Sequence, residues 1–260
     1  MNLAEIRVVL RPRTQAELLD LAALWCFAVD RGLFARLAAA VLLPSLALCA
    51  AARGLGGWAW VDVWILAVAV ATVTQGVFTV AASRALFSRE VAVGEVLRTF
   101  VGRLPAYLGA LVITRVILGL AALTAVLAPP AWARIAFVHE ACLLEGASPV
   151  DAAKRAWALA RSRGVEVMIL LGGIGVALAV MVAASELLGR ALVEFILQLP
   201  GVFGGLLEGG SYYALVGFHA AIPYVAVARF LGYIDQRTRG DGWDIQLRFM
   251  ALANERGGAP

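Results

Sequence analysis

Residues 165–184 have the sequence VEVMILLGGIGVALAVMVAA, in which Glu166 is the one charged residue. A helix of about twenty residues extends for about 30 Å, the thickness of the hydrocarbon core of a bilayer. The rest of the 260-residue chain has the same character, because 62% of its residues are hydrophobic and 15% are charged. This composition excludes a water-soluble domain, a disordered chain and a disulfide-rich secreted protein. We therefore predict an all-α, polytopic membrane helical bundle.

Apolar runs of similar length predict about six membrane crossings in one integral membrane domain, residues 1–260. The runs cover residues 33–52, 61–82, 105–127, 131–144, 165–184 and 211–231. The six-crossing core therefore extends over residues 33–231. We expect an amphipathic cytoplasmic segment before it, over residues 1–32, and a cytoplasmic tail after it, over residues 232–260.

The basic residues indicate the orientation of these crossings. With both termini in the cytoplasm, 18 of the 22 Lys and Arg residues lie on the inner side, whereas Arg53, Arg134 and Arg190 lie on the outer side. Such an inner excess is typical of the positive-inside rule. Residues 191–207 are apolar enough for a seventh crossing, but that crossing would place the Arg-rich tail outside. We therefore expect residues 191–207 to form an external interfacial or re-entrant helix.

Three amphipathic segments, each followed by a pair of crossings, predict a weak internal repeat. Residues 14–17 have the spacing of a helix capping box, and residues 148–151 have that of a Ser-capped helix start. Residues 90–104 place apolar side chains at helical spacing. We expect these cytoplasmic helices to lie on the inner leaflet with their Arg side chains toward anionic lipid. The alternative is that they only connect crossings.

Polar residues within the predicted crossings are the best candidates for a functional site, because burying them in a bilayer costs free energy. The candidates are Arg115, His139, Glu140, His219 and Gln75. Their depths predict one polar layer that contains both histidines and could act as a proton relay, a substrate pocket or a metal pair. The alternative, which we favour, is ordinary helix packing in which Arg115 pairs with Glu140.

Motifs for catalysis, cofactors, metals and nucleic acids are missing from the sequence. It has no phosphate-binding glycine loop, no Gly-x-Ser-x-Gly elbow and no Cys-x-x-Cys pair. His139 and Glu140 resemble the start of a zinc-protease helix, but no second His follows four residues after the first. No basic cluster is interleaved with aromatic residues in the manner of a nucleic-acid site. We therefore expect no enzyme activity, cofactor, metal or nucleic-acid partner. The three cysteines, Cys26, Cys49 and Cys142, should be buried free thiols.

Three cytoplasmic stretches together resemble a known family. Residues 10–20 (LRPRTQAELLD) open with an Arg-Pro pair, residues 143–159 contain Leu-Glu-Gly before a capped helix, and residues 233–247 contain an aromatic-x-Asp-x-Arg-x-Arg signature. The motif residues of the last two stretches are Glu145, Asp151, Arg155, Trp157, Asp235, Arg237, Arg239, Asp241, Trp243 and Asp244. The set is similar to bacterial six-crossing proteins of the glycerophosphoryl diester phosphodiesterase membrane-domain family.

This resemblance implies a stand-alone protein of the bacterial cytoplasmic (inner) membrane. Phosphodiesterase activity is not implied, because it belongs to a separate soluble domain for which this chain has no room. The resemblance also places the shared residues in cytoplasmic loops and the tail rather than in a pore. In the tail, we expect Asp241 to cap a short helix whose apolar residues, such as Trp243 and Leu247, pack on the inner ends of the crossings. We also expect the tail to dock against the helix at 148–163.

Three functions are compatible with these observations. The first, which we favour, is a non-enzymatic inner-membrane scaffold or accessory subunit that binds a protein partner or anionic lipid through its cytoplasmic face. The second is a small transporter or channel that uses the polar layer, and a continuous water-filled cavity reaching this layer would distinguish it. The third is an intramembrane lipid-modifying enzyme, which ranks last because the sequence identifies no nucleophile.

Overall fold

The computed structural model describes residues 11–88, 90–161, 163–199, 203–205 and 209–241. Its α-helices are α1 (Gln15–Leu24), α2 (Arg31–Leu37), α3 (Leu43–Gly54), α4 (Trp60–Phe87), α5 (Val93–Ala122), α6 (Ala128–Ile135), α7 (Val138–Leu144), α8 (Pro149–Ala160), α9 (Gly164–Arg190) and α10 (Tyr212–Asp241). Short π-helical segments are η2 (Trp25–Val29), η3 (Ala38–Leu42) and η4 (Ala191–Ile196). Two short antiparallel strands, β1 (Gly204–Gly205) and β2 (Gly210–Ser211), precede α10. The all-α prediction is confirmed.

Within the described residues, five helices are long and apolar enough to cross a membrane, so the chain is a multi-pass membrane protein. They are Arg31–Gly54 (α2, η3 and α3), Trp60–Phe87 (α4), Val93–Ala122 (α5), Gly164–Ile196 (α9 and η4) and Tyr212–Gly240 (α10). The most apolar part of each has a mean hydropathy between 1.6 and 2.6.

The fourth predicted crossing is divided into two short helices. Pro129 and Pro130 lie in the first turn of α6, which has 8 residues, and α7 has 7. Phe137, between them, has φ −103 and ψ 15, which lies outside the α-helical region. Neither piece is long enough to span a bilayer by itself. A sixth crossing at this segment stays a prediction.

Two further segments differ from the sequence-based expectation. Residues 90–104, expected to form a separate interfacial helix, include the start of α5, which continues through Pro105. The proposed repeat is therefore interrupted at its second unit. Residues 191–196, expected to begin an external helix, prolong α9 as η4. The chain has no turn-forming residue at this junction, and the left-handed conformation comes only at Gln198, where φ is 56.

The helix starts predicted at residues 14–17 and 148–151 are confirmed. The Thr14 hydroxyl accepts from the backbone N–H of Glu17, and the Glu17 carboxylate accepts from the backbone N–H of Thr14. This second bond, together with Arg11, holds the pKa of Glu17 below its usual value. The Ser148 hydroxyl likewise accepts from the backbone N–H of Asp151. Both amphipathic helices, α1 and α8, therefore begin with a side-chain cap.

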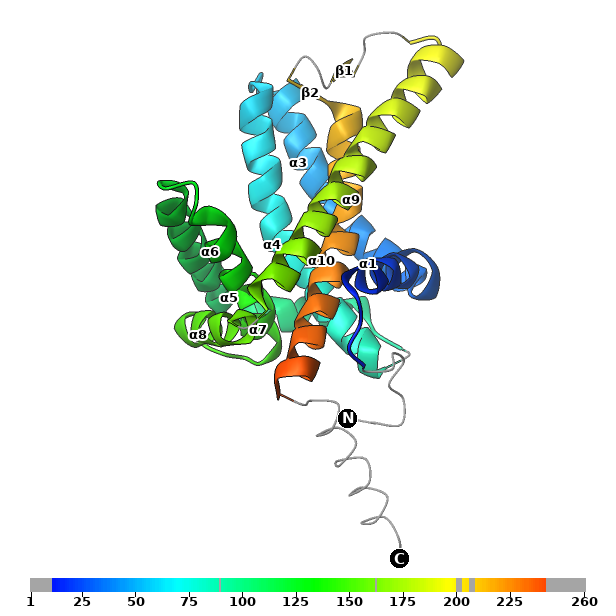
Figure 1. Cartoon of the computed structure of the whole chain (residues 1–260). Coiled ribbons are helices and arrows are strands. Elements are labelled where there is room, and N and C mark those ends of the chain that lie inside the picture. Colours follow the sequence, from blue (N-terminus) through cyan, green and yellow to red (C-terminus); the bar gives the residue numbers. More distant parts are fainter. Residues whose placement is uncertain (1–10, 89, 162, 200–202, 206–208, 242–260) are drawn as a thin grey trace, which may run out of the picture.

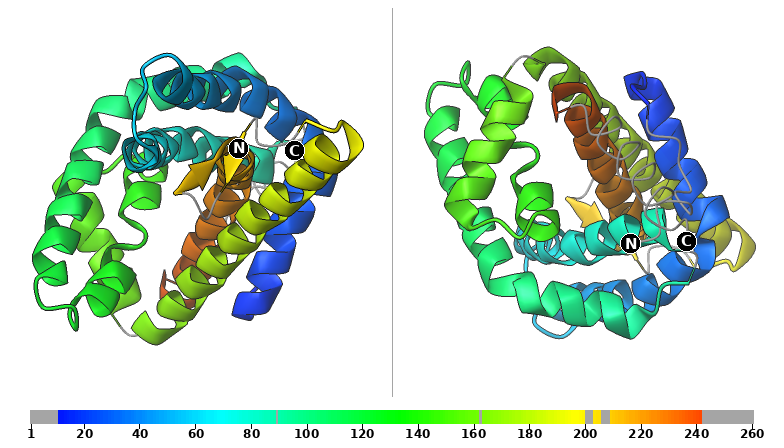
Figure 2. Two further views of the ribbon diagram at one scale, coloured as in Figure 1. Left: turned by 90° about the horizontal axis from the view of Figure 1, so that it is seen from above. Right: turned by 90° about the horizontal axis from the view of Figure 1, so that it is seen from below.

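Helix α10 lies at the centre of the bundle, where it packs along α9 and α4 (Figure 1). In its most apolar part 72% of the residues are buried, against 22% for α5 and for α9. A Cβ atom added at Gly232 would overlap Leu170, and one at Gly217 would lie 3.0 Å from the Met181 carbonyl oxygen. These glycines let α9 and α10 approach closely. Figure 2 shows this pair side by side, with α5, α6 and α8 grouped on one side of it.

Candidate functional site

The C-terminal half of α10 carries polar side chains that contact other parts of the chain. Arg229, Tyr233 and Arg237 are spaced four residues apart, so they lie close to one face of the helix. This face meets two acidic residues, Glu140 on α7 and Glu145 directly after it. A second face carries Asp235 and Arg239, which are also four residues apart. We call these α10 residues and their partners the α10 network.

Arg229 and Glu140 form a buried ion pair at the deep end of the network. Arg229 Nε lies 2.8 Å from Glu140 Oε1, and Arg229 Nη2 lies 3.1 Å from Glu140 Oε2. Nη2 also donates to the carbonyl oxygen of Ala136, at the break between α6 and α7. The Glu140 side chain is 0% exposed. This bidentate geometry offsets part of the free-energy cost of removing both charges from water.

The predicted pairing of Arg115 with Glu140 is wrong. Glu140 faces α10, and Arg115 Nη2 instead donates to the Thr72 hydroxyl at 3.2 Å. Sequence reasoning missed Arg229 because its position near the end of a crossing resembles that of an ordinary inner-side charge. The signal that could have identified it is the four-residue spacing with Tyr233 and Arg237 within an apolar helix.

Glu145 joins the loop between α7 and α8 to α10. It accepts a hydrogen bond from the Tyr233 hydroxyl. Arg155 Nε on α8 and Arg237 Nη1 each lie 3.5 Å from its carboxylate. The next residue, Gly146, has φ +69, a conformation that favours glycine, and its carbonyl oxygen accepts from Arg103 at 3.3 Å. The Leu-Glu-Gly motif therefore combines an ion-pair centre with the turn that positions it.

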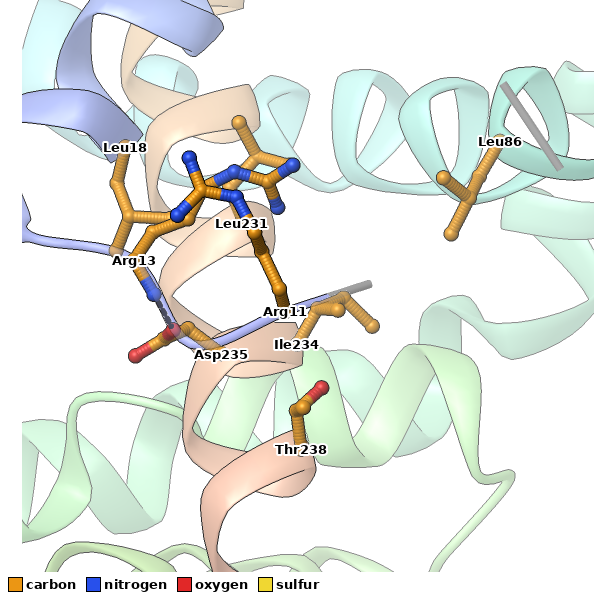
Figure 3. A pocket seen from close by; sticks show the side chains of 8 residues that line it. All are labelled: Arg11, Arg13, Leu18, Leu86, Leu231, Ile234, Asp235 and Thr238. Atoms are coloured by element: carbon orange, nitrogen blue, oxygen red, sulfur yellow. Dashed lines mark hydrogen bonds between the residues drawn. The ribbon is translucent and has the colours of Figure 1, made fainter. Parts of the chain in front are cut away.

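Asp235 joins α10 to the N-terminal stretch. Its Oδ1 accepts from the backbone N–H of Arg13 at 2.9 Å, and its Oδ2 lies 2.8 Å from Arg239 Nε. Arg239 Nη2 also donates to the Arg13 carbonyl oxygen at 2.5 Å. Figure 3 shows Arg13 and Asp235 meeting beside a small hollow of about 10 Å³, roughly the space of one water. Burial, followed by the neighbouring Arg11, lowers the pKa of Arg13.

The three stretches that carry the family resemblance therefore converge on one end of α10. The N-terminal stretch contributes Arg13, and the middle stretch contributes Glu145 and Arg155. The third stretch begins within α10 and contributes Asp235 and Arg237. Asp151, from the middle stretch, stays local, because it accepts from Ser148 and lies 3.9 Å from Lys154. The Asp241 side chain, Trp243, Asp244 and the expected docking of the tail lie outside the residues whose side chains the structure describes.

The remaining polar candidates form two groups rather than one layer. His139 Nε2 lies 3.3 Å from Thr114 Oγ1, and its ring meets Tyr107 edge to face at 5.4 Å between centroids. The Tyr107 hydroxyl donates to the Thr72 carbonyl oxygen at 2.7 Å, and Arg115 reaches the hydroxyl of the same Thr72. A chain of neighbouring polar groups thus extends from Arg115 toward His139.

His219 belongs to a different cluster. Its Nδ1 lies 2.8 Å from the Leu215 carbonyl oxygen, and its Nε2 lies 3.1 Å from Ser45 Oγ, which joins α10 to α3. The two histidines therefore bond to different helices, and His219 has the local contacts of a packing residue. Gln75 is half-buried, and no hydrogen bond in the described part of the chain joins its side chain to either histidine.

Metal and thiol chemistry receive no support from the described residues. Among them, no three His, Cys, Asp or Glu side chains lie close enough to hold a metal ion. Cys26, Cys49 and Cys142 are buried free thiols, as expected. Burial, with a smaller contribution from Asp30, raises the pKa of Cys26 to about 12. This thiol is therefore protonated, and unreactive as a nucleophile, at neutral pH.

An Arg-rich groove lies between α6, the end of α8 and the start of α9, with a volume of about 380 Å³. Arg134, Arg161 and Arg163 line it, and Glu166 is the one acidic residue in its lining. Arg163 Nη1 lies 3.1 Å and 3.2 Å from the two carboxylate oxygens of Glu166. Apolar walls come from Pro130, Ala133, Val165 and Met168. The groove thus combines an excess of positive charge with apolar surface.

Arg134 contacts α8, so it cannot lie on the opposite side of the membrane from Trp157, where the sequence-based map placed it. Its guanidinium carbon lies 4.7 Å from the centroid of the Trp157 ring. The sequence-based map separated these two residues because it treated residues 131–144 as one crossing, whereas α6 packs against both α8 and α9. Trp157 therefore contributes to a mixed aromatic and cationic surface beside the groove.

Comparisons with protein-family models, with curated proteins and with solved structures found no match to this chain. The resemblance carried by the three sequence stretches therefore stays a prediction. The geometry of the α10 network and of the Arg-rich groove is the basis for the function proposed below.

Proposed function

We propose that this chain is a non-enzymatic scaffold or accessory protein of the bacterial cytoplasmic membrane, and that its cytoplasmic face binds anionic lipid. The observation that carries the proposal is the Arg-rich groove, where three arginines face one carboxylate beside apolar walls. A phosphate-bearing headgroup matches the guanidinium groups, and the adjoining acyl chains match Val165 and Met168. The positive-inside distribution supports cytoplasmic termini, and the positions of Arg161 and Arg163 in it support an inner-leaflet location for this groove.

The α10 network supports a scaffold rather than an enzyme. Its three carboxylates, on Glu140, Glu145 and Asp235, each have an arginine within 3.5 Å. Ion pairs of this kind hold the carboxylates in place within the protein, whereas general acid–base catalysis needs a group that can reach a substrate. The network thus joins the N-terminal stretch, α7, α8 and α10 into one platform. A protein partner bound to this platform would make the chain an accessory subunit.

A transporter or channel is the second candidate, favoured by the polar groups that extend from Arg115 toward His139. It ranks lower because Glu140, the most deeply buried acid among the described residues, is paired with Arg229. A proton or ion pathway would require that pair to open. Ion or proton flux in liposomes containing the purified protein would favour this candidate over the scaffold.

The lipid-binding proposal can be tested by quantifying lipids that remain bound to the purified protein. The protein is exchanged into detergent with equal phosphatidylglycerol and phosphatidylcholine, and retained lipid is measured by native mass spectrometry. We expect retention of phosphatidylglycerol to fall about tenfold or more in the triple variant R134Q/R161Q/R163Q, because each arginine near an anionic surface contributes about 1 kcal/mol.

The matched control is R31Q/R36Q/R98Q, which removes the same charge from three exposed arginines outside the groove. This control should retain phosphatidylglycerol as the unmodified protein does. Equal losses in both triple variants would show that retention follows total charge and not the groove. Equal binding of the two lipids by the unmodified protein would contradict the proposal directly.

A further inference from the structure

A second groove, distinct from the Arg-rich one, lies between α4 and α5 and has a volume of about 560 Å³. Its apolar lining is Val61, Trp64, Ile65, Val68, Ala69 and Leu111. The α4 residues recur at intervals of three and four, so they form one continuous face of that helix. From Val61 to Thr72 this face is about 17 Å long. The volume falls within the range of roughly 300–1,000 Å³ that is usual for small-molecule sites.

Arg115 is the one charged residue that lines this groove. Its side chain is exposed, and its Nη2 donates to Thr72 Oγ1 at 3.2 Å. Thr72 Oγ1 in turn donates to the Val68 carbonyl oxygen at 2.6 Å, which fixes the hydroxyl. Among the described residues, no carboxylate lies within ion-pair distance of Arg115. Glu140, the acid predicted to neutralise Arg115, forms its ion pair with Arg229 instead.

This combination leaves Arg115 without a counter-charge from the described part of the chain. Arg115 is seven residues from the end of α5, a helix long and apolar enough to cross the membrane. An arginine at such a depth is stabilised by an acidic partner, by water or by an anionic ligand. The described chain supplies one hydroxyl and a long apolar face. The missing component is therefore a negative charge attached to an apolar chain.

We propose that this groove binds a single-chain amphiphile with a carboxylate head. The carboxylate would bind the Arg115 guanidinium, whose planar fork matches two carboxylate oxygens, and the chain would lie along α4 toward Trp64. One arginine and one hydroxyl suit a head with a single charge. The α4 face that lines the groove is about 17 Å long and accommodates one chain, whereas a phospholipid has two chains and a larger head.

The test is equilibrium binding of radiolabelled hexadecanoate to the purified full-length protein in neutral detergent, with hexadecanol as the uncharged comparison. We expect the acid to bind about tenfold or more tightly than the alcohol, because hydrogen bonds to charged groups are stronger than those to neutral ones. In R115Q this preference should disappear, and R115K should retain part of it. R53Q, which removes an arginine outside the groove, should bind as the unmodified protein does.

A second variant keeps the proposal falsifiable if R115Q does not fold. Ala69→Trp fills the groove while keeping Arg115, so it should weaken binding of both the acid and the alcohol. Equal binding of acid and alcohol by the unmodified protein would overturn the proposal, as would a preference that survives in R115Q. Displacement of the acid by an equal concentration of phosphatidic acid would overturn the single-chain assignment. The triple variant R134Q/R161Q/R163Q should bind hexadecanoate normally, which separates this site from the lipid groove.

Discussion

Arg229 and Arg115 are both arginines of membrane-crossing helices, yet their surroundings are opposite. Arg229 is largely buried and bound by both carboxylate oxygens of Glu140. Arg115 is exposed in an apolar groove and has a hydroxyl, not a carboxylate, as its partner. The difference separates two kinds of intramembrane charge. A charge neutralised within the chain joins helices, and a charge without an acid among the described residues is open to the external partner that we propose.

Loss of Arg229 should produce the largest effect. In R229Q the buried Glu140 loses its counter-charge, so we expect the free energy of unfolding to fall by about 3–5 kcal/mol. The measurement is unfolding in mixed micelles with increasing denaturing detergent. The matched control is R115Q, which should change stability by less than about 1 kcal/mol, because that arginine makes one exposed hydrogen bond.

Replacing both Arg229 and Glu140 tests the same comparison by removing the two buried charges together. The double variant R229L/E140L leaves no uncompensated charge, and it should recover most of the stability that R229Q loses. If R229Q and R115Q destabilise the protein equally, the contrast between a structural and a ligand-binding arginine is wrong.

The turn that positions Glu145 should produce an intermediate effect. Gly146→Ala places a side chain at φ +69, and its Cβ would meet the Arg103 guanidinium. We expect a loss of about 1–3 kcal/mol in the free energy of unfolding. Gly102→Ala is the control, because that helical glycine has open space around it, and alanine there should be neutral or stabilising. Equal stability of the two variants would show that the α10 network does not depend on this turn.

Thr72→Val should have a small effect on stability and a larger one on binding. The hydroxyl that Arg115 contacts is lost while the shape of the side chain is kept, so stability should change by less than about 1 kcal/mol. Binding of hexadecanoate should weaken by about two- to tenfold, because the arginine is no longer held in position. Thr99→Val, which removes a hydroxyl far from the groove, should leave this binding unchanged. Unchanged binding in Thr72→Val would contradict the positioning role.

The smallest effect on stability is expected from Glu17, an acid whose side chain is in contact with water. The folded-state pKa of Glu17 is lowered by its bond from Thr14. Its contribution to stability is therefore present above the unfolded-state pKa and is lost as pH falls through the folded-state pKa. A comparison of the protein with E17Q over pH 3 to 7 (about the range in which an Asp or Glu titrates) should show the two stabilities converging at the acidic end. A difference that stays constant with pH would exclude this ionic contribution.

Much of the architecture could be predicted from residues close together in the sequence. The helix caps at Thr14 and Ser148 depend on a side chain and a backbone amide three residues away, so the sequence reveals them directly. The long apolar helices are equally local. The division at Phe137 was not predicted, because the apolar run gives no sign that α6 and α7 change direction. The same cause separated Arg134 from Trp157, which it contacts.

The candidate sites depended on contacts across the chain. Glu145, Arg155 and Arg237 were recognised as motif residues, but not as one cluster, because they are up to 92 residues apart. Arg115 and Glu140 were recognised as intramembrane charges, but the pairing assigned to them was wrong. A charge can pair with any opposite charge at a similar depth, and sequence spacing does not indicate which face of a helix meets which neighbour.

The sequence by itself therefore determined the class of protein, since 62% hydrophobic residues in runs of about 20 can be buried only in a bilayer. It also determined the helix starts and the presence of costly intramembrane charges, because these depend on composition and on residues within one turn. Only the tertiary structure decided that Arg229 neutralises Glu140 and that Arg115 faces a groove. Pairing depends on how α5, α7 and α10 are rotated against one another, and that rotation results from the packing of all the helices together.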